Sequence, residues 1–250
     1  MQVAVLSDIH GNLPALEAVI ADISETGASE LWCLGDVVGY GASPNECTTL
    51  VRESCSAVLV GNHDLAVLGA LDTSTFSGAA SAAVEWTQER MTDDSLEYLR
   101  GLDPADPTRD AALYHASPRD PVWEYVLWPD QAADCIAVQE RRVSMVGHSH
   151  VALFFSVPDE DGARSGPREA RGWQAGAGTR LEISEGRWLI NPGSVGQPRD
   201  GDSRAAWLEL DTESWEATYH RIAYDIDRAA AAIEATDLPP HLAKRLYVGR

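Results

Sequence analysis

Carboxylate and imidazole side chains recur along this sequence at the points where short apolar segments end. The run "VAVLS" stops at Asp8 and His10, and the run "ELWCLG" stops at Asp36. Later runs stop in the same way, and the whole set in chain order is Asp8, His10, Asp36, Asn62, His63, Asp64, His115, His148 and His150. Five of the seven histidines belong to it. Because Zn²⁺, Mn²⁺ and Fe accept imidazole and carboxylate together, the set indicates a metal site.

The number of these residues favours two metal ions over one. Seven of them count as candidate ligands. One ion needs fewer once room is left for water, whereas a shared carboxylate can bridge two ions about 3.5–4 Å apart. Each residue taken singly is also an ordinary turn or cap former. The metal site is the stronger interpretation because the whole ordered set follows successive apolar runs.

The elements that must position these residues are strands and helices in alternation. In open α/β sheets, side chains on the loops after the strands converge at the carboxyl ends of the strands. Short apolar runs bounded by polar residues predict the strands "QVAVLS", "ELWCLGD", "AVLVGNHD", "ALYHASP" and "VSMVGHSHVALFFSV". Helical spacing predicts helices over residues 13–24, 43–54, 78–90, 93–102, 225–235 and 240–245, with Ser43 as an N-cap.

The second half of the chain is predicted to form mainly β-strands. Four segments are spaced closely enough for antiparallel neighbours: "TRLEIS", "RWLINPGS", "SRAAWLELD" and "WEATYHRIAY". Residues 158–177 have no apolar period and are predicted to form a surface loop or hairpin insert instead of a domain linker. We therefore expect an α/β fold with two packed sheets and helices outside, in a single domain over residues 1–250.

The chain is acidic, with 39 Asp and Glu against 19 Lys and Arg and a formal net charge of -20. This charge disfavours long nucleic acid and anionic membranes as partners. The sequence has no basic leader and no long apolar run, which predicts a cytoplasmic protein without a membrane span. The cysteines Cys33, Cys47, Cys55 and Cys135 contain no C-x-x-C pair and indicate buried, reduced thiols.

Five motifs resemble those of the calcineurin-like metallophosphoesterases: "SDIHGN", "GDVVGYG", "GNHD", the His of "LYHASP", and "GHSH", within residues 3 to 200. The resemblance implies a four-layer α-β-β-α sandwich of two mixed sheets flanked by helices. It also implies two ligand sets that share Asp36. One metal would take Asp8, His10, Asp36 and His150, and the other would take Asp36, Asn62, His115 and His148.

The resemblance further implies the chemistry of the site. Two divalent ions, Mn²⁺ first with Fe, Zn²⁺ or Ni²⁺ as alternatives, would activate a shared water for in-line attack on a phosphoryl group. Asp36 would bridge the ions, and His63 would protonate the leaving oxygen or donate a hydrogen bond to the transition state. Asp64 is a candidate to orient His63. The partner expected is a small phosphoester or nucleotide, either a monoester or a diester.

The same resemblance separates this chain from some branches of the family. The protein Ser/Thr phosphatases carry an Asp and an Arg where this chain has Gly39 and Tyr40, and the symmetrical diadenosine tetraphosphate hydrolases also carry an Arg there. The segments "GDVVGYGASPNEC" and "NPGSVGQPRDG" resemble a group of small bacterial phosphoesterases, related to diadenosine tetraphosphatase-like and YfcE-like proteins. Asymmetrical dinucleoside polyphosphate hydrolysis and protein phosphatase activity remain alternatives, as does a metal-binding regulatory module without turnover.

Two further residues are candidates for substrate binding. Arg199 can grip phosphate oxygens with its guanidinium, although it also reads as an exposed residue of a turn. Asn12 can point its amide at a substrate, or it can cap the helix that follows. Trp123 and Trp128 can stack on a base or simply pack. The sequence leaves the oligomeric state open between monomer and homodimer.

Overall fold

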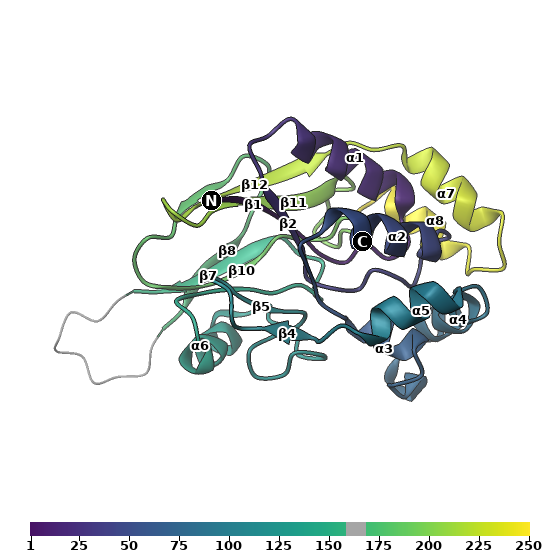
Figure 1. The fold of residues 1–250 in the computed structure, drawn as a ribbon, viewed down its shortest axis with the longest axis horizontal. Coiled ribbons are helices and arrows are strands. Elements are labelled where there is room, and N and C mark those ends of the chain that lie inside the picture. Colours follow the sequence, from purple (N-terminus) through teal and green to yellow (C-terminus); the bar gives the residue numbers. More distant parts are fainter. Residues whose placement is uncertain (159–168) are drawn as a thin grey trace.

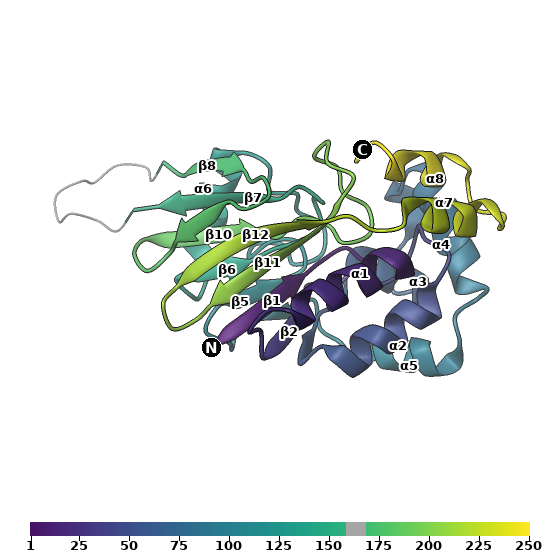
Figure 2. The same cartoon turned by 90° about the horizontal axis from the view of Figure 1, so that it is seen from above.

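The computed structural model describes residues 1–158 and 169–250, and its strands form two six-stranded sheets. From top to bottom, Figure 1 shows helix α1, the first sheet, the second sheet and helix α6. Figure 2 shows helices α3, α4, α7 and α8 gathered at one end of the molecule. The architecture is the predicted pair of mixed sheets flanked by helices.

The first sheet has the strand order β3-β2-β1-β11-β12-β9. Strands β1, β2 and β3 are parallel, and β11, β12 and β9 continue the sheet in antiparallel fashion. At the centre, Val5 pairs with Trp32 on one side and with Leu208 on the other. The strands are β1 (Gln2–Leu6), β2 (Glu30–Cys33), β3 (Ala57–Val58), β9 (Arg180–Glu182), β11 (Ala205–Asp211) and β12 (Glu216–Ile222).

The second sheet has the order β4-β5-β6-β10-β7-β8. Strands β5, β6 and β10 are parallel, whereas β4, β7 and β8 pair antiparallel with their neighbours. The strands are β4 (Ala105–Asp106), β5 (Ala112–Tyr114), β6 (Val143–Met145), β7 (Leu153–Val157), β8 (Arg171–Gln174) and β10 (Arg187–Asn191). The prediction that β10 is an antiparallel neighbour of β9 and β11 was wrong, because β10 crosses into the other sheet.

Helices cover both outer faces of the sandwich. Helix α1 (Leu13–Ser24) packs on β11 and β12, and α6 (Pro129–Val138) packs on β7 and β10. The remaining helices are α2 (Pro44–Ser54), α3 (Asn62–Val67), α4 (Gly78–Gln88), α5 (Asp93–Arg100), α7 (Ile226–Glu234) and α8 (His241–Leu246), with a 3-10 turn at Thr73–Thr75. The sequence reading missed α6 and took the start of α3 as the end of a strand.

Alternating side chains of β1 show how the layers are held together. Val3 and Val5 belong to the apolar cluster between the two sheets, together with Met145. Ala4 and Leu6 point the other way and join the cluster under α1. A strand with both faces buried in this way needs a continuous apolar run, as "VAVL" provides. The end of β1 is therefore fixed from both sides, and so is the position of the polar residues that follow it.

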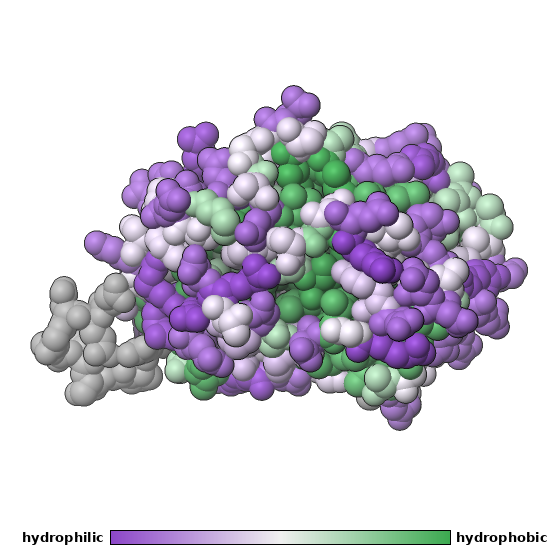
Figure 3. Space-filling model, in the orientation of Figure 1, coloured by the Kyte–Doolittle hydropathy of each residue, from purple (hydrophilic) through white to green (hydrophobic). Residues whose placement is uncertain are grey.

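The segment 158–177 includes one strand. Strand β8 pairs with β7, so the described part of this segment forms half of a hairpin, and residues 159–168 lie outside the described residues. On the face shown in Figure 3, hydrophobic residues gather in a band across the middle and hydrophilic residues dominate both sides. None of the helices in the described chain is long and apolar enough to cross a membrane. All four cysteines are free, and Cys33, Cys47 and Cys135 are buried.

Candidate metal centre

The ends of the parallel strands converge on one buried cluster of acidic and imidazole side chains. Asp8 and His10 follow β1, Asp36 follows β2, and His115 follows β5. His148 and His150 come after β6, and Asn62 is the first residue of α3. All seven predicted ligands are at most 3% exposed. The fold therefore brings together residues that are separated by up to about 140 positions in the sequence.

Two groups of potential ligand atoms share one carboxylate. Asp8, His10, Asp36 and His150 form the first group, in which the ligand atoms lie within 4.8 Å of one another. Asp36, His115 and His148 form the second. The Asn62 Oδ1 atom lies 3.1 Å from His115 Nε2, next to the second group. Asp36 thus occupies the position that a bridging carboxylate requires.

Each carboxylate has one oxygen bound to the main chain and one oxygen without a partner. Asp8 Oδ2 accepts a hydrogen bond from the main-chain N–H of His148 (3.1 Å), and Asp36 Oδ1 accepts one from that of His63 (2.8 Å). Asp8 Oδ1 and Asp36 Oδ2 are buried and have no hydrogen-bond partner among the described residues. Buried oxygens without partners are rare, because they lose their hydration without compensation. These two atoms are where a cation would bind.

The imidazoles are oriented by carbonyl groups. The Nδ1 atoms of His10, His115 and His150 lie 3.1, 2.9 and 2.6 Å from the carbonyl oxygens of Val38, Leu34 and Gln197. His148 is reversed, with Nε2 3.2 Å from the carbonyl oxygen of Trp123. Each of these nitrogens must carry the proton, because a carbonyl oxygen only accepts. The other ring nitrogen keeps its lone pair for a metal.

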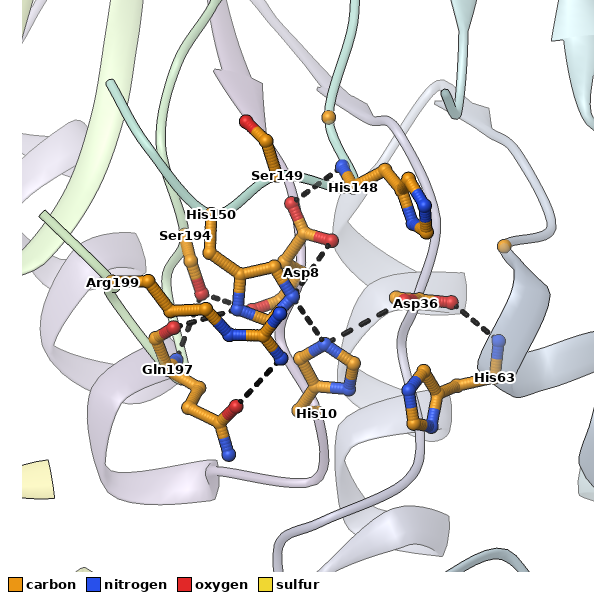
Figure 4. Close-up of polar contacts among 12 residues, drawn as sticks. Asp8, His10, Asp36, His63, His148, Ser149, His150, Ser194, Gln197 and Arg199 are labelled. Atoms are coloured by element: carbon orange, nitrogen blue, oxygen red, sulfur yellow. Dashed lines mark hydrogen bonds and ion pairs between the residues drawn. The ribbon is translucent and has the colours of Figure 1, made fainter. Parts of the chain in front are cut away.

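One contact in the cluster is unfavourable without a cation. His10 Nε2 and His150 Nε2 are 3.0 Å apart, and both carry lone pairs in the tautomers that the carbonyl contacts select. His10 Nε2 also lies 3.6 Å from Asp36 Oδ2, and His150 Nε2 lies 3.5 Å from Asp8 Oδ1. Figure 4 shows His10 and His150 side by side with Asp8 and Asp36 around them. A positive ion between these atoms would replace the repulsion with coordination.

Burial changes the pKa values of the acidic and imidazole side chains in the cluster. It raises the pKa of Asp8 to about 7 and the pKa of Asp36 well above the usual carboxyl range. It lowers the pKa values of His10, His148 and His150 well below the usual imidazole range. Neutral imidazoles and buried carboxylates that need a counter-charge are the donor set that a divalent cation favours. The residues present fit a pair of metal ions.

The backbone around the cluster is strained in a consistent way. Five of the predicted ligands have left-handed backbone conformations with φ between 50° and 63°: Asp8, His10, Asp36, His148 and His150. Non-glycine residues seldom adopt this conformation, and such residues concentrate at functional sites. Hydrogen bonds between the loops stabilise these left-handed conformations. One example is the bond from the Asp8 N–H to the Gly35 carbonyl (3.0 Å).

Glycines beside the ligands allow the loops to approach one another. A Cβ atom on Gly61 would overlap Asp36 Oδ1, and one on Gly147 would overlap Ser7 Oγ. Gly35, with φ 98°, would bring a Cβ to 2.8 Å from the Gly61 nitrogen. The glycines next to Asp36, Asn62 and His148 therefore permit the loops to lie closer together than a residue with a Cβ atom would allow.

Comparison with known proteins identifies the family to which this cluster belongs. The model of the calcineurin-like phosphoesterase superfamily domain matches residues 1–213. The chain belongs to the calcineurin-like phosphoesterase superfamily. It is therefore a hydrolase that acts on phosphoester bonds, with small phosphoesters as substrates. The motifs in the sequence had indicated this family, and the resemblance is confirmed.

One relative and one solved structure are similar over nearly the whole chain, and a further relative matches part of it. An uncharacterized protein of Methanocaldococcus jannaschii is 37% identical over 99% of this chain and 98% of its own length. A metallophosphoesterase structure from Sphaerobacter thermophilus has a TM-score of 0.87 and 37% identity, and the match covers 100% of this chain and 99% of that one. A symmetrical bis(5'-nucleosyl)-tetraphosphatase of Actinobacillus pleuropneumoniae is 34% identical over 74 residues, 28% of this chain and 27% of that protein.

His63 of this phosphoesterase lies beside the ligands, but Asp64 does not orient it. The Asp64 carboxylate accepts hydrogen bonds from the main-chain N–H groups of Val37 (3.2 Å), Val38 (2.9 Å) and Gly61 (2.9 Å). His63 Nδ1 is buried and has no partner in the described part of the chain. The suggestion that Asp64 orients His63 was therefore wrong. Asp64 instead fastens the loop after β2 to the start of α3.

The two predicted substrate-binding residues differ in their surroundings. The Asn12 side chain accepts a hydrogen bond from the Ala15 N–H (3.2 Å) and donates to the Gly196 carbonyl (2.8 Å) and the Tyr224 hydroxyl (3.3 Å). Asn12 is thus the N-cap of α1, the alternative that the sequence left open. Arg199 projects toward His10 and His150 in Figure 4, and its Nη2 donates to Gln197 Oε1 (3.0 Å).

A cleft of about 790 Å³ opens beside the cluster on the side of Asn62 and His63. Arg199 and Arg245 line it together with the aromatic residues Tyr40, Phe76, Trp123 and Tyr125. The sequence reading missed Arg245, Phe76, Tyr40 and Tyr125, because nothing in their local spacing marks them. Trp128, which the sequence had paired with Trp123, is 68% exposed and does not line the cleft.

Proposed function

We propose that this protein is a dinuclear metal-dependent phosphoesterase that hydrolyses small phosphomonoesters or phosphodiesters. One metal would be held by Asp8, His10, Asp36 and His150, and the other by Asp36, Asn62, His115 and His148. The observation that carries the proposal is the pair of buried carboxylate oxygens without partners, Asp8 Oδ1 and Asp36 Oδ2, among imidazole nitrogens that face them with lone pairs.

The ions, when bound, polarise the phosphoryl oxygens and activate a water for in-line attack. His63 faces the cleft in which the leaving group would lie. Burial and the charge of Arg199 lower the pKa of His63 well below the usual imidazole range, so the ring is neutral in the free protein. A neutral imidazole still carries one N–H, and we propose that it donates a hydrogen bond to the leaving oxygen.

Arg199 is the proposed phosphate ligand of the protein. Its guanidinium lies 5.8 Å from the centre of the Tyr40 ring. In other branches of the superfamily, the segment that here reads Gly39-Tyr40 carries an Arg. An Arg from the loop after β10 would then grip the phosphoryl oxygens, because a guanidinium offers two parallel donors. Mn²⁺ is the proposed metal, with Fe, Zn²⁺ and Ni²⁺ as alternatives that accept the same ligands.

Hydrolysis of dinucleoside polyphosphates is a second candidate. Two observations favour it: the partial match to proteins named as symmetrical bis(5'-nucleosyl)-tetraphosphatases, and the cleft of about 790 Å³ lined by aromatic residues. The match covers about a quarter of each protein, so it supports the type of reaction more than the identity of the substrate. A panel of nucleotide polyphosphates separates this candidate from a simple esterase.

The experiment that tests the proposal is hydrolysis of bis-p-nitrophenyl phosphate and of p-nitrophenyl phosphate, with Mn²⁺ or with a chelator. Asp36→Asn should lower turnover by at least about a thousandfold, because it removes the charge shared by both ions. The preferred substrate would distinguish a diesterase from a monoesterase. Equal turnover by the wild-type protein with chelator and with Mn²⁺ would contradict the proposal.

A further inference from the structure

Arg199 and Arg245 line the cleft, and neither pairs with the side chain of a described Asp or Glu. Seven of the sixteen described arginines form an ion pair with an Asp or Glu: Arg52, Arg90, Arg109, Arg119, Arg204, Arg221 and Arg228. Arg199 and Arg245 have no ion pair with an Asp or Glu of the described residues. Arg199 Nε is buried without a partner, and Arg245 Nε donates to the main-chain oxygen of Arg250.

Arg199 and Arg245 are close enough to influence each other. Burial lowers the pKa of Arg245, and the charge of Arg199 lowers it further. The cleft contains one carboxylate among its described lining residues, Asp72, and both of its oxygens accept hydrogen bonds from Ser74. Two neighbouring positive charges that repel each other and have no direct ion pair with an Asp or Glu of the described residues favour an anionic ligand between them.

Arg245 comes from a part of the chain that the superfamily model does not match. That match ends at residue 213, whereas Arg245 lies in α8. Helix α8 packs through Leu242, Ala243 and Leu246 against α7, α4 and Tyr40. Figure 2 shows these helices together at the end of the molecule. Helix α8 thus contributes Arg245 to the wall of the cleft from outside the matched part of the chain.

The positions of the groups around the cleft define where this anion would lie in a substrate. Asn62 and His63 border the cleft at the metal centre, and Arg245 lines it together with the aromatic residues Phe76 and Trp123. Phe76 and Trp123 pack edge to face, with ring centres 5.4 Å apart. A phosphoryl group at the metals would direct its leaving group past His63 into this space.

We propose that Arg245, with Arg199, forms a second anion subsite for the leaving group, and that the preferred substrates carry a second phosphate next to the scissile one, as nucleoside diphosphates do. The inference rests on the proposed function, because the first phosphate must bind the metals. In such a reaction the water oxygen bonds to the terminal phosphorus while the bridging P–O bond breaks. The nucleoside monophosphate leaves with the electron pair, and the proton of the water passes to solvent.

ADP and AMP are the probes, because they differ by one phosphate on the same nucleoside. Their inhibition constants are measured against p-nitrophenyl phosphate hydrolysis by the Mn²⁺-loaded protein. The wild-type protein should bind ADP about tenfold more tightly than AMP, as expected for one charge-assisted contact. Arg245→Gln should reduce this ratio to about two, and Arg245→Lys should keep an intermediate value. Lys244→Gln is the matched control, because Lys244 is an exposed cation on the same helix.

The inference is overturned if Arg245→Gln leaves the ratio unchanged, or if Lys244→Gln lowers it equally. Failure of the proposed function is a different outcome, because it is the absence of metal-dependent turnover on any phosphoester. In that case calorimetric titration of ADP and AMP into the same Mn²⁺-loaded proteins gives the ratio directly. Absence of binding of both nucleotides in that titration would also overturn the inference.

Discussion

At the scale of single residues, the candidate metal centre depends on which atom of each side chain makes no hydrogen bond to the main chain and can therefore bind a metal. A carbonyl oxygen fixes one nitrogen of His10, His115, His148 and His150, so the other nitrogen must point inward with its lone pair. Main-chain N–H groups fix one oxygen of Asp8 and of Asp36 in the same way. Pre-orientation of this kind spares the site the loss of side-chain entropy when a metal binds.

His63 is the residue whose role is most directly testable. His63→Ala should lower kcat by about 10²–10⁴-fold, because it removes the proposed donor to the leaving oxygen. The metal content, measured by inductively coupled plasma mass spectrometry, should stay at the wild-type value. His241→Ala, at an exposed histidine of α8, is the control and should change neither quantity. Loss of metal from His63→Ala would instead make His63 a ligand.

At the scale of elements, the loops after β1, β2 and β6 and the start of α3 are held against one another. Asp64 joins two of them through three main-chain N–H groups, and Ser194 Oγ donates to the Asp8 carbonyl (2.7 Å) from the loop after β10. The segment "NPGSVGQPRDG" therefore supports the end of β1 as well as carrying Arg199. Asp64 and Ser194 are supporting residues that the sequence did not identify as such.

Asp64→Ala should destabilise the protein by at least about 2 kcal/mol, because three buried N–H groups would lose their acceptor. Chemical denaturation of the metal-free protein measures this directly. Asp72→Ala is a suitable control, since Asp72 is exposed and bonds only within its own turn. If the two variants unfold at the same denaturant concentration, Asp64 does not hold the loops together.

Gly61→Ala tests the close approach of two elements. The added methyl group would overlap Asp36 Oδ1, so Asp36 must move away from the position shared by both ligand groups. We expect Mn²⁺ affinity to fall by at least about tenfold and the free energy of unfolding to fall by about 1–3 kcal/mol. Gly78→Ala is the control, because nothing lies within 4 Å of a Cβ there. Unchanged Mn²⁺ affinity in Gly61→Ala would contradict the tight fit.

At the scale of the whole molecule, the sandwich carries its site where the two sheets meet at the carboxyl ends of their parallel strands. The cluster between the sheets and the clusters under the outer helices bury both faces of the strands, so the strand ends cannot shift independently. Helix α8, which packs on α7, then adds Arg245 to the wall of the cleft. A ligand that binds the native cluster therefore stabilises the entire fold.

Removal of metal should lower the melting temperature of the whole protein. A ligand present at about a thousand times its Kd adds about 4 kcal/mol to the free energy of unfolding, which corresponds to about 10 °C for a domain of this size. Calorimetry with Mn²⁺ and with chelator measures the difference, and renewed addition of Mn²⁺ should restore it. His10→Ala, which removes a ligand of one of the two proposed metals, should show a smaller difference between the two conditions. A wild-type melting temperature that is the same with and without chelator would contradict a native metal site.

Local patterns in the sequence were enough to predict the types of residue at the site and most of the helices and strands that carry them. Apolar runs with both faces buried, and polar residues directly after them, are local patterns, so β1, α1 and the clustering of the candidate ligands were predictable. Tertiary structure alone decided that β10 joins the second sheet, that Asp64 bonds main-chain N–H groups instead of His63, and that Arg199 and Arg245 share a cleft. These contacts join segments far apart in the chain, and local spacing does not encode which distant partner a strand, a carboxylate or a guanidinium will meet.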